Sequence, residues 1–101
     1  MRLVEIVFQL DGLSDDDWIG MQKPWSMDAQ CRVSRMPDDL RWPESESSAG
    51  YAYFLEISTA REALEKCTAP HFSMRDRALV LLYYAEYDAW PNWALKLQAA
   101  T

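Results

Sequence analysis

The sequence is poor in the residues from which nucleotide and metal sites are built. Its three glycines stand alone at positions 12, 20 and 50, so it has no glycine-rich phosphate loop. Its two cysteines and one histidine are too few for a zinc site. It also lacks an HExxH pattern and a serine nucleophile elbow. We therefore expect no metal and no nucleotide or other cofactor.

Basic residues are in deficit as well. The chain has 10 Lys and Arg against 16 Asp and Glu, a net charge of −6. Binding to nucleic-acid phosphates needs clustered Lys and Arg, so we expect no nucleic-acid partner. This charge suits solubility alone, or a basic protein partner.

Long apolar runs are absent too. No stretch approaches the roughly 20 apolar residues that span a bilayer, so we expect no membrane partner. The first residues, MRLVE, carry charge where a signal peptide would be apolar. These features predict a cytoplasmic protein with reduced thiols, although two cysteines leave one disulfide open.

What the chain does have is a core-sized length and many aromatic residues. Its 101 residues fit one domain, residues 1–101, and half of them are hydrophobic. Five Trp, five Tyr and three Phe are more than a core of this size needs. The surplus indicates a ligand pocket or a partner surface, unless these side chains simply fill the core.

The first half of the chain predicts two strands around a short helix. Residues 2–10 alternate, with Val4, Ile6, Phe8 and Leu10 on one face, which favours a strand. A helix is expected from Ser14, kinked or ended by Pro24. Residues 30–36 alternate again and predict a strand. Residues 37–50 form a long polar loop, either a functional lid or a solvated connection.

The second half predicts a strand, a helix and a further strand. Residues 51–57 alternate as a strand does, and a capping box at Thr59 opens a helix that Pro70 ends. Residues 77–87 fit a buried strand, which we favour, or a helix beginning at Ser73. A short helix is expected after Pro91.

The resulting order, βαββαβ, is the α+β ferredoxin-like arrangement with an antiparallel sheet. Its helices cover one face of the sheet, and the other face combines Glu5, Gln9 and Glu56 with apolar side chains. Leaving that apolar area in water is unfavourable, so we expect a homodimer that packs face to face.

Four stretches resemble a known superfamily. They are similar to the dimeric α+β barrel superfamily, and within it to the small mono-oxygenase family of the YdhR type. The stretches are LVEIVFQL, MQKPW, AGYAYFLEISTAREALEKCTA and YAEYDAWPNWALKLQAA. The resemblance implies a homodimer whose sheets enclose a pocket for a hydrophobic small molecule. It also implies a cofactor-independent mono-oxygenase or a cyclase acting on an aromatic or polyketide-like compound.

Three residues are candidates for catalysis. His71 is the only side chain suited to proton transfer near neutrality, and a cyclase of the resembled superfamily carries a His at a similar place. Glu5 and Glu56 lie on the mixed sheet face, where enclosure would raise and split their pKa values. The alternatives are a loop histidine and two solvated or arginine-paired carboxylates.

Five aromatic side chains are candidates for lining a pocket, although ordinary packing would explain most of them equally well. They are Trp25, Trp42, Tyr53, Phe54 and Tyr84.

A second hypothesis comes from a different class of protein. The chain would be an acidic, non-enzymatic inhibitor, such as an immunity or anti-defence protein, that blocks a basic protein partner. Its acidic stretches would supply charge complementarity and fast association. These stretches are residues 15–17 and 44–46.

Overall fold

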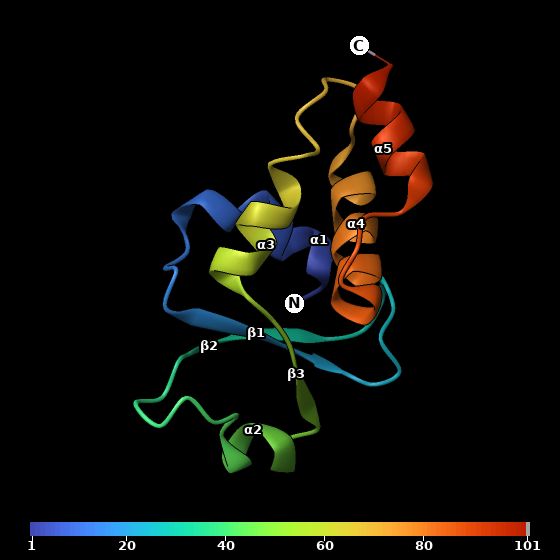
Figure 1. The fold of residues 1–101 in the computed structure, drawn as a ribbon. Helices are drawn as coiled ribbons and strands as arrows, with labels where there is room; N and C mark the ends of the chain where they lie inside the picture. The colour runs from blue at the N-terminus through green and yellow to red at the C-terminus, as the bar shows by residue number, and fades with distance from the viewer. Residues whose placement is uncertain (101) are drawn as a thin grey trace.

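The computed structural model describes residues 1–100 and has an α+β fold. A three-stranded antiparallel sheet carries helices α1, α3 and α4 on one side, while the short α2 lies on the other (Figure 1). The α+β class expected from the sequence is thus confirmed. In chain order the elements are α1 (Leu3–Phe8), η1 (Leu10–Gly12), β1 (Asp17–Gln22), β2 (Cys31–Arg35), α2 (Glu44–Ser48), β3 (Tyr51–Glu56), α3 (Ile57–Leu64), α4 (Met74–Tyr87) and α5 (Asn92–Ala99).

Strand β1 is the centre of the sheet, whose order is β2-β1-β3. Ile19 pairs with Val33 of β2 and with Leu55 of β3, and the β1–β3 register shifts between Ile19 and Gly20. Successive side chains of a strand point to opposite faces. Ile19 and Met21, both fully buried, therefore face the helices, whereas Trp18 and Gly20 face the other way.

The core lies between the sheet and the helices. It joins buried side chains of α1, β1, β3, α3 and α4. A smaller cluster built around Phe72 and Val80 seats α5 against α4. The indole of Trp90 donates a hydrogen bond to the Ala63 carbonyl at 2.8 Å, which ties the segment before α5 to α3.

The strand expected over residues 2–10 is wrong, because α1 occupies most of it. Leu3, Ile6, Val7 and Leu10 are all buried, and their spacing is that of one helix face. Phe8, which the alternating pattern placed with the apolar set, is 79% exposed. The backbone amide of Arg2 donates to Glu5 Oε1 at 2.9 Å and helps to start the helix.

The helix expected from Ser14 is also wrong. Residues 17–22 form the central strand, and the Ser14 hydroxyl accepts a hydrogen bond from the Asp16 amide in a tight turn instead of capping a helix. Trp18 and Met21 share a helical spacing by coincidence, since they lie on opposite faces of β1.

The strand favoured for residues 77–87 is replaced by α4, so the helical alternative beginning at Ser73 is the correct one. Ser73 Oγ accepts from the Asp76 amide, and Asp76 Oδ2 accepts from the Ser73 amide, each at 3.0 Å. With three strands rather than four among residues 1–100, the βαββαβ order is not confirmed.

The remaining elements agree with the sequence. The strands expected over residues 30–36 and 51–57 are β2 and β3, and the helices expected near Thr59 and after Pro91 are α3 and α5. The capping box expected at Thr59 is wrong, because α3 already begins at Ile57 and has no side-chain cap. The polar loop of residues 37–50 contains α2, a helix of only five residues. Within residues 1–100 no helix has both the length and the apolar character to cross a membrane.

Candidate functional site

The three catalytic candidates lie in different local settings, and within residues 1–100 no hydrogen bond or ion pair joins them. Glu5 accepts from the Arg2 amide in the first turn of α1. Glu56 is the last residue of β3, and its Oε2 accepts a hydrogen bond from the Ser58 hydroxyl at 3.5 Å. The ring of His71 is exposed between α3 and α4, and its Nε2 lies 2.8 Å from the Leu97 carbonyl oxygen. The structure therefore assembles no catalytic group from them.

The five pocket candidates separate into three places. Trp25 packs edge-on against Phe54 in the core, with ring centroids 5.1 Å apart. Tyr84 packs against Trp90, also edge-on, at 5.2 Å. Trp42 and Tyr53 come together on the opposite side of the sheet, 6.0 Å apart.

Trp42 and Tyr53 belong to a surface that we call the aromatic face, made of Trp18, Trp42 and Tyr53. Trp18 stacks on Trp42 at 5.9 Å and meets Tyr53 edge-on at 5.4 Å. Trp42 Nε1 donates to the Tyr51 carbonyl at 2.9 Å, which anchors the chain before α2 to β3. The Trp42 ring lies directly over Gly20, where a Cβ would sit 2.7 Å from it. Only glycine allows so close an approach.

Arg32 borders this face from strand β2. Its guanidinium lies 4.3 Å from the centre of the Tyr51 ring and 3.1 Å from Glu46 of α2. Burial, with a further contribution from the Glu56 carboxylate, raises the pKa of Tyr53. The Tyr53 hydroxyl therefore stays protonated to a higher pH than that of an ordinary tyrosine.

Charge is distributed unevenly between the two parts of the molecule. Residues 14–56, which build the sheet and its outer face, contain nine acidic and four basic residues, a net charge of −5. Residues 57–100, which build α3, α4 and α5, contain five of each. The Met36 amide donates to the Asp16 carbonyl at 2.9 Å, so the loop that carries the aspartates at 38 and 39 starts beside Asp16. Residues 14–56 therefore carry most of the chain's net negative charge, and of their aspartates Asp15 pairs with Arg61 of α3.

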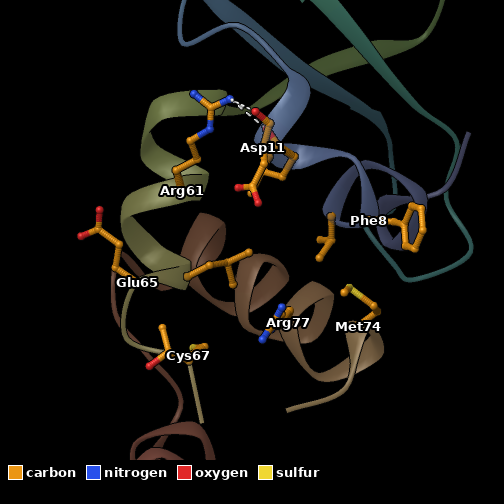
Figure 2. Close-up of a pocket in the computed structure, with 11 residues that line it drawn as sticks. Phe8, Asp11, Arg61, Glu65, Cys67, Met74 and Arg77 are labelled. Atoms are coloured by element: carbon orange, nitrogen blue, oxygen red, sulfur yellow. Dashed lines mark hydrogen bonds between the residues drawn. The ribbon is translucent and has the colours of Figure 1, made fainter. Parts of the chain in front are cut away.

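A separate pocket of about 370 Å³ opens on the helical side, between α1, α3 and α4 (Figure 2). Its apolar wall comes mainly from Val7, Phe8, Leu64 and Met74. A shallow apolar depression that shares Phe8 and Met74 continues from it along α1. We call this pocket the helical groove.

Four charged residues line the helical groove, and one of them is already fully engaged. Arg61 pairs with Asp15 and donates to the carbonyls of Leu10, at 2.9 Å, and Leu13. Its role is to hold the chain between η1 and β1. Asp11, Glu65 and Arg77 form no ion pair within the described part of the chain.

Arg77 is the least expected member of this set. It is half-buried, and its Nε is buried without a hydrogen-bond partner among residues 1–100. The sequence interpretation overlooked Arg77 because it treated residues 77–87 as a strand. The signal that would have found it is the Ser73–Asp76 capping box, which places Arg77 in the first turns of α4.

The two cysteines are buried, unpaired and unsuited to catalysis. Burial raises the pKa of Cys31 to about 11, and burial also raises that of Cys67 despite the opposing charge of Arg77. Thiols of this kind stay protonated and unreactive near neutral pH. Residues 1–100 also contain no group of three His, Cys, Asp or Glu side chains that could hold a metal ion.

Comparison with known proteins adds no relative. No protein-family model, no curated protein and no solved structure matches the chain. The similarity to the dimeric α+β barrel superfamily therefore stays a prediction.

Proposed function

We propose that the protein is a non-enzymatic binding protein that captures a basic protein partner on the sheet side of the molecule. The observation that carries this proposal is the charge distribution, since residues 14–56 hold −5 of the chain's −6. A concentrated negative field attracts a basic partner, speeds its association and repels acidic competitors. Nucleic acid is repelled by the same field.

The aromatic face supplies the anchors that charge alone lacks. Tyr53 is 40% exposed, and Trp42 is half-buried beside it. Tyrosine and tryptophan are enriched among the residues that dominate binding energy at protein interfaces, where a polar rim commonly surrounds them. Here the rings are already fixed by stacking and by the Trp42–Tyr51 hydrogen bond, so little side-chain freedom is lost on binding.

Catalysis in a dimeric α+β barrel has less support from this structure. That hypothesis needs a four-stranded sheet with one enclosed face and a proton-transfer group inside it. The sheet has three strands, and His71, Glu5 and Glu56 are separate from one another. A cytoplasmic location, which would keep Cys31 and Cys67 reduced, is compatible with either function and stays a prediction.

The test is affinity capture from the native host at low salt, followed by binding measurements with the purified partner. We expect one basic protein that is retained at about 50 mM salt and released at about 500 mM, because surface charges are screened over a few ångströms at high ionic strength. Tyr53→Ala should weaken binding by tenfold or more, an effect of about 1.4 kcal/mol or larger.

Tyr87→Ala is the matched control. Tyr87 is also an exposed tyrosine, 58% exposed, but it lies on α4 in the electrically neutral part of the chain. The proposal is wrong if no basic protein is retained. It is equally wrong if Tyr53→Ala and Tyr87→Ala weaken binding to the same extent.

A further inference from the structure

Arg77 is a half-buried, charged side chain of the helical groove that has no ion-pair partner within residues 1–100. Its Nε is also without a hydrogen-bond partner there, but that atom is buried too deeply for a ligand to reach, so a ligand would meet the charge through the other nitrogens of the guanidinium. Arginine does not lose its proton in proteins, so this side chain stays positively charged and favours an anionic partner. A carboxylate is its best complement, because two parallel N–H···O bonds fit the planar guanidinium.

The other charges of the groove restrict what that carboxylate can belong to. Figure 2 shows the Asp11 carboxylate turned toward the pocket, whereas Glu65 extends outward from α3. Asp11 has no ion-pair partner in the described residues, and Arg61 is saturated by Asp15 and two carbonyls. A plain carboxylic acid would meet repulsion from Asp11, and a plain amine would leave Arg77 unpaired.

The wall of the groove selects the remainder of the ligand. Val7, Leu64 and Met74 offer apolar surface, and Phe8 offers an aromatic ring that is 79% exposed. A volume of about 370 Å³ is at the small end of the roughly 300–1,000 Å³ that ligand pockets occupy. The space therefore suits a compound of amino-acid size with one apolar group.

We propose that the helical groove binds a free α-amino acid with an apolar side chain. Arg77 takes the carboxylate, Asp11 takes the ammonium group, and the side chain packs against Phe8 and Met74. The site lies between α1, α3 and α4, on the side of the sheet away from the aromatic face (Figure 1). It is independent of the partner surface proposed above.

L-Phenylalanine is the probe, and the Nε–Hε resonance of Arg77 is the reporter, identified by its loss in Arg77→Met. We expect L-phenylalanine to shift this resonance with saturation below about 10 mM. 3-Phenylpropionate and N-acetyl-L-phenylalanine lack the ammonium group, and phenethylamine lacks the carboxylate. Each should bind at least about tenfold more weakly, since each leaves either Asp11 or Arg77 without its charged partner.

Two variants and one control complete the test. The variants are followed by the shifts of backbone amide resonances, because Arg77→Met removes the reporter side chain. Arg77→Met should weaken L-phenylalanine binding at least about tenfold, while Arg75→Met, which removes an exposed arginine of the same helix outside the groove, should not change it. Asp11→Asn should weaken L-phenylalanine and strengthen 3-phenylpropionate, which separates recognition from damage to the fold.

The proposal is overturned if L-phenylalanine fails to saturate the Arg77 resonance at about 10 mM. It is also overturned if N-acetyl-L-phenylalanine binds as well as L-phenylalanine, since the groove would then recognise a peptide carboxyl terminus. An Asp11→Asn variant with unchanged ligand preference would refute the assignment of the ammonium group.

Discussion

Replacing Gly20 by alanine tests whether the aromatic face is one packed unit. A Cβ at this position would lie 2.7 Å from Cη2 and 2.8 Å from Cζ2 of Trp42, closer than carbon atoms can approach. Since Gly20 sits on the central strand between two neighbours, the backbone cannot move away easily. The indole of Trp42 must therefore shift instead.

The cost follows from what the indole loses. Its stacking on Trp18 is worth about 0.5–1.5 kcal/mol beyond burial, and its hydrogen bond to the Tyr51 carbonyl is worth about 0.5–1.5 kcal/mol. Alanine regains about 0.5–1 kcal/mol relative to glycine within a strand. We expect Gly20→Ala to lower the free energy of unfolding by about 1 kcal/mol, the difference between the central values of these effects.

Urea unfolding followed by far-UV circular dichroism measures this cost, and near-UV circular dichroism reports the Trp18–Trp42 stack directly. Gly12→Ala is the matched control, because nothing lies within 4 Å of a Cβ at that position. It should leave stability within about 0.5 kcal/mol or raise it slightly.

A double-mutant cycle decides whether Trp42 is the cause. In a Trp42→Ala background the ring is gone, so Gly20→Ala should cost nothing or become mildly stabilising. If Gly20→Ala costs the same with and without Trp42, the loss comes from the strand itself and the reasoning above is refuted.

Three further predictions concern elements away from the aromatic face. Ser73→Ala removes the cap of α4 and should cost about 1 kcal/mol in urea unfolding, while Ser48→Ala, at an exposed position of α2, should cost little. Arg61→Ala frees Asp15 and two loop carbonyls and should cost about 2 kcal/mol, against almost none for the exposed Arg75→Ala. Burial raises the pKa of Cys31 from 9.0 to about 11, so its contribution is complete below pH 9 and is lost as the pH rises through 11. Wild-type stability should fall by roughly 2–3 kcal/mol across that range, and a Cys31→Ala variant with the same decline would contradict this assignment.

Elements with one unambiguous local pattern could be predicted from the sequence. Strand β3 is rich in aromatic and branched residues, and α3 carries a helical stripe of buried Ala60 and Ala63, so both were expected near their observed places. Their details were not, since the β1–β3 register shifts and α3 begins at Ile57, before the cap expected at Thr59. The short α5 follows Pro91, which fixes a backbone angle suitable for helix entry. Each of these elements is recognisable within about ten residues of chain.

The elements that could not be predicted carry two patterns at once. In the first segment Ile6 and Leu10 satisfy a strand with Val4 and Phe8, but they equally satisfy a helix with Leu3 and Val7. Packing of α1 against α4 decides between them by burying the helical set and leaving Phe8 in water. Such a contact joins residues about seventy positions apart, so no local window contains it.

The candidate sites were harder still, because they depend on those unpredicted elements. The sequence supplied Trp42 and Tyr53 as separate pocket candidates, but only β1 as a strand places Trp18 between them. Arg77 enters the helical groove only if residues 74–87 are helical and α1 lies opposite. The Ser73–Asp76 capping box indicates the first condition, whereas the second depends on packing between segments far apart in the chain.

The uneven charge distribution gives the two proposed surfaces opposite responses to salt. A partner drawn to the sheet side depends on long-range attraction by a net charge of −5, which screening at about 8 Å under physiological conditions already weakens. The helical groove lies among residues whose charges balance, and its ligand carries no net charge. Only contacts at hydrogen-bond distance hold that ligand, and screening affects partly buried contacts of this kind far less. Raising the salt concentration should therefore release the protein partner while the Arg77 resonance still responds to L-phenylalanine. Loss of both together would mean that one surface, not two, is responsible.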